Sequence, residues 1–221
     1  MKKNLFILLV FSLLACQKDG GQPLGGAEFA NIVPGNFWIY EVKSEGYSLT
    51  AKPEFLTYQL KEKIGNAISP NTYIVERSRR LNSSEPWVNI GNAWVGVSAE
   101  GIILNNGDGS KFTLKFPLKE NVTWSLSQVS TPVDTKVLVK NYGNDATILG
   151  KIYTQTATIQ AKNDTSLVET NRDIEIYAKN IGLISKEKTN IAYCQSTDCI
   201  GKGKPDNGIR YKQNLLSFGK E

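Results

Sequence analysis

The sequence predicts a single all-β domain of antiparallel strands, preceded by a short apolar segment at the N-terminus. From about residue 35 onward, apolar and polar residues alternate in short runs that are rich in β-branched and aromatic side chains. Turn residues separate these runs at regular spacing, and no helical pattern of three turns or more follows the N-terminal segment. A chain of 221 residues is a suitable length for one such domain.

The N-terminal segment has the features of an export signal. Lys2 and Lys3 precede an apolar run from Leu5 to Leu14, and the small residue Ala15 precedes Cys16. The run is too short to span a bilayer, which needs about 20 apolar residues. An ordinary signal peptide followed by an incidental cysteine is the alternative interpretation.

Residues 13–16, Leu-Leu-Ala-Cys, resemble the lipobox of bacterial lipoproteins. The resemblance implies that residues 1–15 are removed and that Cys16 carries the lipid that anchors the chain to a membrane. Residues 16–33 are rich in glycine and are expected to form a flexible tether, which leaves residues 34–221 as the all-β domain. Gln17-Lys18-Asp19 also resembles the short export signal of surface lipoproteins of the Bacteroidota. The expected location is the cell envelope, on the outer membrane, facing either the periplasm or the exterior.

Each expected strand follows from a run of alternating or β-branched residues between turn signals. Asp173 and Glu175 alternate with Ile174 and Ile176, for example, so that the two isoleucines share one face. Asn105–Gly109 is a run of turn residues and predicts a hairpin rather than a calcium loop, since the spacing of the oxygen ligands is wrong. In chain order, the expected strands are Gly35–Val42, Phe55–Lys61, Thr72–Arg79, Trp87–Ile90, Ala93–Val97, Gly101–Leu104, Lys111–Phe116, Val122–Leu126, Thr135–Asn141, Ala146–Tyr153, Thr154–Ala161, Arg172–Ala178, Gly182–Glu187 and Ile209–Leu216.

Composition argues against nucleic acid as a partner. Of the 26 basic residues, Lys2 and Lys3 would leave with the signal, so 24 would face 21 acidic residues, a net charge of +3. The basic residues are scattered along the chain, whereas proteins that bind nucleic acid concentrate them in a patch or stripe.

Cys194 and Cys199 form an even pair in a chain that is expected to be exported. Export means an oxidising environment, so a disulfide that closes a small polar loop is the expected structure. A redox or metal pair is the alternative, but the spacing is not C-x-x-C and the chain contains no histidine to complete a zinc site.

Three further segments resemble a group of uncharacterised exported lipoproteins of the Bacteroidota: Pro34–Tyr40, Phe116–Trp124 and Ile176–Glu187. The resemblance covers most of the mature chain and depends mainly on aromatic and glycine positions. It implies one strongly curved antiparallel sheet or an incompletely closed barrel of roughly ten to twelve strands, similar to lipoprotein-carrier or lipocalin-like half-barrels. No functional residue can be transferred from this group.

The chain lacks the residues that common catalytic sites need. Without histidine it has no side chain that is a base near neutral pH, and it contains neither a G-x-S-x-G motif nor a P-loop. Carboxylates are spread along the chain without a distinctive motif. The sequence therefore predicts a protein that is not an enzyme, with no catalytic residues, no metal and no cofactor.

Two functions remain open at this stage. The first is a binding protein whose curved sheet holds a glycan, a lipid or a partner protein, and the second is a structural component of an envelope assembly without a small-molecule pocket. Among the tryptophans, Trp38 and Trp124 are expected in the core, and Trp87 is the candidate for an exposed ligand contact. A cavity of several hundred cubic ångströms would favour the first function.

Overall fold

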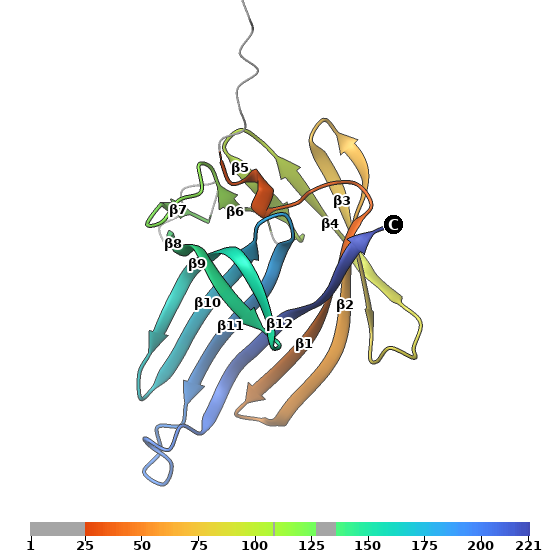
Figure 1. Cartoon of the computed structure of the whole chain (residues 1–221). Helices are drawn as coiled ribbons and strands as arrows, with labels where there is room; N and C mark the ends of the chain where they lie inside the picture. Colours follow the sequence, from red (N-terminus) through yellow and green to blue (C-terminus); the bar gives the residue numbers. More distant parts are fainter. Residues whose placement is uncertain (1–24, 108, 127–135) are drawn as a thin grey trace, which may run out of the picture.

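The computed structural model describes residues 25–107, 109–126 and 136–221. These residues form one antiparallel sheet of twelve strands in the order β6-β5-β4-β3-β2-β1-β12-β11-β10-β9-β8-β7, preceded by one 3-10 turn, η1 (Figure 1). The bounds are η1 Ala27–Phe29, β1 Asn36–Ser48, β2 Ala51–Ser69, β3 Thr72–Arg80, β4 Val88–Val97, β5 Gly101–Asn105, β6 Ser110–Lys115, β7 Thr123–Ser125, β8 Lys136–Ile148, β9 Lys151–Thr165, β10 Glu169–Ala178, β11 Gly182–Tyr193 and β12 Pro205–Lys220.

The sheet curves into a barrel that is closed except for one seam. Pairing of β1 with β12 joins the first six strands to the last six, so that β6 and β7 are the two free edges. These edges meet at Phe112, whose N–H donates to Leu126 O at 3.1 Å and whose carbonyl accepts the Trp124 indole N–H at 3.1 Å. The expected all-β fold, a single antiparallel sheet forming an incompletely closed barrel, is confirmed.

Strand alternation places an apolar core inside the barrel, with residues from both halves of the sheet. On β1, Trp38, Tyr40 and Val42 point inward, and on β2 Leu60 and Ile64 do the same; all five are at least 95% buried. Trp124 of β7 is equally buried, at 5% exposure. Trp38 and Trp124 are therefore core residues, as expected.

Residues 25–35 lie across one end of the barrel and close it (Figure 1). Leu118 N–H donates to Gly25 O at 2.8 Å and Asn180 N–H donates to Glu28 O at 2.7 Å, while Phe29 is buried in the core. At Gly26 an added Cβ would lie only 2.7 Å from Leu118 Cβ, and its φ of 130° also favours glycine. Residues 25–33, which the sequence places in a flexible tether, thus pack against the barrel, because glycines that permit close packing resemble a flexible linker in sequence.

One expected strand, Ala146–Tyr153, is in fact a hairpin. Leu149 and Gly150 both have positive φ, 49° and 79°, and they form a two-residue turn between β8 and β9. The tip of this hairpin reaches β12, where Lys151 Nζ lies 5.6 Å from the centre of the Phe218 ring. Leu149 is apolar and Gly150 is the only typical turn residue between the two strands, so the sequence signal for this turn is weak.

Cys194 and Cys199 lie at disulfide distance in the loop between β11 and β12, with their Cα atoms 5.8 Å apart. This agrees with the disulfide expected from the sequence. The expected hairpin at Asn105–Gly109 also forms and joins β5 to β6, with Asn105 Oδ1 accepting the Gly107 N–H. Over the residues described, no helix is long and apolar enough to span a membrane.

Candidate functional site

The interior of the barrel contains a cavity of about 780 Å³. Its apolar lining comes mainly from β5, β8 and β9, and its polar lining comes mainly from β10 and β11, which follow β9 in the sheet, with further polar groups from β6 and its flanks. The apolar lining residues are Leu104, Leu126, Val137, Ile159 and Ala161, and the charged ones are Lys111, Lys162, Arg172, Asp173, Glu175, Lys186 and Lys188. Asn106, Ser110, Thr113, Asn171, Thr189 and Asn190 complete the polar lining together with Gly109.

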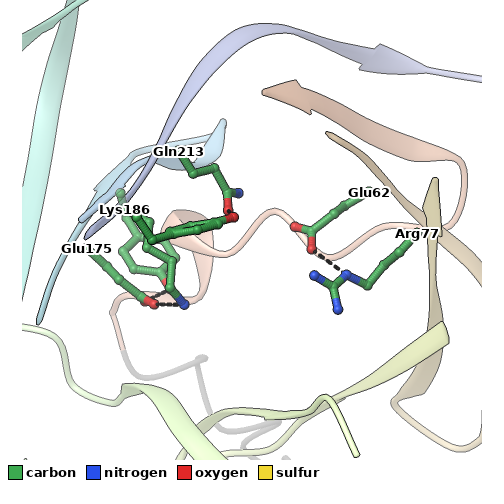
Figure 2. Close-up of polar contacts among 7 residues, drawn as sticks. Glu62, Arg77, Glu175, Lys186 and Gln213 are labelled. Carbon is green, nitrogen blue, oxygen red and sulfur yellow. Dashed lines mark hydrogen bonds and ion pairs between the residues drawn. The ribbon is translucent and has the colours of Figure 1, made fainter. Parts of the chain in front are cut away.

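Two ion pairs lie inside the barrel between the cavity and the apolar core (Figure 2). Glu62 of β2 pairs with Arg77 of β3, with 3.2 Å between Oε1 and Nε. Glu175 of β10 pairs with Lys186 of β11 at 2.7 Å and also accepts a hydrogen bond from the Tyr177 hydroxyl at 2.6 Å. Figure 2 shows the two pairs extending toward one another from different strands.

The two glutamates differ in their electrostatic environment. Burial raises the pKa of Glu175, but the neighbouring Lys186 and the hydrogen bond from Tyr177 outweigh it, so its pKa lies below the usual 4.5. Burial also raises the pKa of Glu62, and because Arg77 and Lys186 offset this only in part, its pKa lies above 4.5. The surroundings of Glu175 thus favour its ionisation on folding, whereas those of Glu62 oppose it.

A smaller apolar pocket of about 100 Å³ lies beneath the segment that closes the barrel. Its lining includes Ala30 and Ile32 of that segment and the indole of Trp38, whose N–H donates to Ile181 O at 2.5 Å. Leu104 and Thr113 line both this pocket and the large cavity, so the two spaces adjoin. The barrel interior therefore changes from apolar at the closed end to polar in the cavity.

The arrangement is suited to binding and does not assign a catalytic role to any side chain. Glu62 and Glu175 each pair with a cation, and Asp173 lies between two lysines of the neighbouring strands. Among the described residues, no group of three acidic or cysteine side chains could hold a metal ion. That the chain is not an enzyme stays a prediction.

Of the site residues predicted from the sequence, those that the structure describes lie outside this cavity. Trp87 is half-buried at the start of β4, where the Arg80 guanidinium stacks 4.2 Å from its ring centre, and it does not contribute to the cavity lining. Cys194 and Cys199 are in the β11–β12 loop, and Cys16 is not among the residues that the structure describes.

Sequence reasoning missed the polar wall of the cavity. Asn171, Asp173 and Glu175 alternate along β10, and Lys186, Lys188 and Asn190 alternate along β11, which is a recognisable period-two pattern of polar residues. Such a pattern normally marks the face of a strand that meets bulk solvent. Here that face lines the interior, and Ile174 and Ile176 lie half-buried on the opposite face.

Comparison with known proteins does not identify a family. No protein-family model matches the sequence, and no curated protein is significantly similar to it.

Proposed function

We propose that this protein is a non-catalytic binding lipoprotein of the bacterial cell envelope, anchored by a lipid on Cys16, that holds a small ligand inside its barrel. The cavity of about 780 Å³ is the observation that carries the binding function. Pockets of about 300–1,000 Å³ that combine apolar lining with a few placed polar groups are typical of small-molecule sites. The lining favours a glycan or a small amphipathic molecule over a partner protein, because the polar groups point into the barrel.

The alternative, a structural component of an envelope assembly, is less well supported. Such a component would need no internal space, and its core could be filled throughout, as it is at the closed end of the barrel. Charged side chains inside a domain lower the stability of the fold, because each must be removed from bulk water. A role in ligand binding explains why the chain keeps them.

The anchor is tested by Cys16→Ser. We expect this variant to lose labelling by radioactive palmitate and to move from the membrane fraction to the soluble fraction, because the lipid has no other attachment point in the proposal. The double variant Cys194→Ser/Cys199→Ser is the matched control, since it removes the other two cysteines and should keep the label. Membrane retention that survives Cys16→Ser would refute the anchor.

The cavity is tested by Ala161→Trp, which places an indole in the large cavity. We expect native mass spectrometry to show a co-purified small molecule on the unmodified protein and its loss from this variant. Asn163→Trp is the control, because Asn163 is exposed on the same strand and does not line the cavity. Loss of the molecule from both variants, or its retention in Ala161→Trp, would place binding elsewhere.

A further inference from the structure

Paired side chains of β10 and β11 form a polar ladder along one wall of the cavity. The strand register sets Asn171 opposite Asn190, Asp173 opposite Lys188, and Glu175 opposite Lys186. All six residues line the cavity. Paired residues of antiparallel strands point to the same face, so the ladder presents three successive polar pairs to a ligand.

The charges of the ladder do not balance at its middle position. Glu175 and Lys186 neutralise one another at 2.7 Å. Asp173, however, is paired in register with Lys188 on one side and with Lys162 of β9 on the other, so two cations flank one carboxylate. Within the described parts of the chain, neither lysine forms an ion pair within 4.0 Å of a carboxylate.

The two lysines are also accessible to a ligand. Both are exposed at the cavity lining, whereas Asp173 is half-buried. Burial raises the pKa of Asp173, and the adjacent Glu175 raises it further, against the opposing effect of three neighbouring lysines. One carboxylate can balance only one of the two lysines that flank it, so an anion that entered the cavity would meet surplus positive charge.

Beside the ladder, β9 and β8 supply an apolar wall to the cavity, since β9 is the strand that pairs with β10. Val137, Ile159 and Ala161 line the cavity from β8 and β9. A ligand that fits both walls has an apolar body and a charged group on one side.

We propose that the cavity binds a small organic anion whose carboxylate, sulfate or phosphate group lies between Lys162 and Lys188. The apolar part of the ligand contacts the wall formed by β8 and β9. This inference rests on the proposed binding function and narrows it to one chemical class. The two lysines would make the cavity select anions over uncharged molecules, which an uncharged cavity of the same size would not do.

The test compares two fluorescent probes that differ in one charged group, 1-anilinonaphthalene-8-sulfonate and N-phenyl-1-naphthylamine. We expect the sulfonate to bind the mature protein more tightly than the neutral probe. Lys162→Gln/Lys188→Gln should weaken sulfonate binding about tenfold, the scale of a lost charge-assisted contact, and leave the neutral probe unchanged. Thermal melting by circular dichroism checks that each variant is folded, since the sulfonate also binds unfolded surfaces.

The control variant is Lys52→Gln/Lys179→Gln, which makes the same change in net charge at two exposed lysines outside the cavity. Equal losses in both double variants would overturn the inference, because net charge alone would then explain binding. Equal affinity for the two probes would overturn it and leave the proposed function intact. Failure of both probes to bind would overturn the proposed function as well.

Displacement of the sulfonate probe then distinguishes the sources of the anion. Galacturonate represents an acidic sugar, octanoate represents a fatty acid, and galactose and octanol are their uncharged counterparts. Displacement by an anion and not by its uncharged counterpart supports the inference and names the source. Equal displacement by an anion and its counterpart contradicts it.

Discussion

Trp38→Ala is expected to lower the free energy of unfolding by about 3–5 kcal/mol, the usual cost of truncating a buried tryptophan. Trp38 is 5% exposed, and it packs in the core that lies beneath the closed end of the barrel. Its indole N–H donates to Ile181 O, so the substitution also removes the shorter of two hydrogen bonds to that carbonyl, the other coming from Asn31 Nδ2 at 3.5 Å. Urea denaturation followed by circular dichroism measures the change.

Trp87→Ala is the matched comparison, because it removes the same side chain from a half-buried position. The indole of Trp87 contacts the Arg80 guanidinium, an interaction worth about 0.5–1 kcal/mol at an accessible site. We expect a loss of about that size in the same denaturation experiment. Comparable losses in the two variants would contradict the assignment of Trp38 to the core.

Glu175→Gln is expected to destabilise the protein at neutral pH by about 2 kcal/mol, between the cost of breaking an exposed ion pair and that of breaking a buried one, because both side chains are partly exposed. The substitution removes the charge that pairs with Lys186 and that accepts the hydrogen bond of Tyr177. Chemical denaturation at a series of pH values measures this loss. A loss below about 1 kcal/mol would show that the pair behaves as an exposed one.

The pH dependence of this loss follows from the lowered pKa of Glu175. A carboxyl whose pKa falls on folding stabilises the protein above the pKa of the unfolded state, and this contribution disappears as pH falls through the folded pKa. The difference in the free energy of unfolding between the unmodified protein and Glu175→Gln should thus be largest at neutral pH and should shrink as pH falls below the usual carboxyl pKa of 4.5.

Glu62→Gln is the matched control, and its effect on the free energy of unfolding should have the opposite sign. The pKa of Glu62 rises on folding, so its ionised form costs stability above the folded pKa, and protonation recovers that cost as pH falls toward 4.5. We expect Glu62→Gln to be neutral or stabilising at neutral pH and to lose this advantage on acidification. If Glu62→Gln destabilises the protein at neutral pH, the attraction between Glu62 and Arg77 outweighs the cost of removing the charged carboxylate from water.

Local pattern was sufficient to predict most of the strands and part of the core. Alternation around Trp38 and around Trp124 identified both as buried, because a period of two puts every second side chain on one face of a strand. Strand ends were harder to predict. The turn at Leu149–Gly150 contains one typical turn residue, and the closely packed Gly26 lies in a glycine-rich segment that resembles a linker.

The sequence by itself determined the all-β class, most of the strands and the position of the cysteine loop, because each depends on residues that are near one another in the chain. Only the tertiary structure decided which face of β10 and β11 is internal, since Asp173 and Ile174 alternate in the same way whichever side is enclosed. The pairing of β1 with β12 joins the two halves into one sheet, between residues about as far apart as the chain allows, and the sheet then curves until its edges β6 and β7 meet at Phe112. Closure turns polar alternation that resembles a solvated face into the charged wall of an internal cavity.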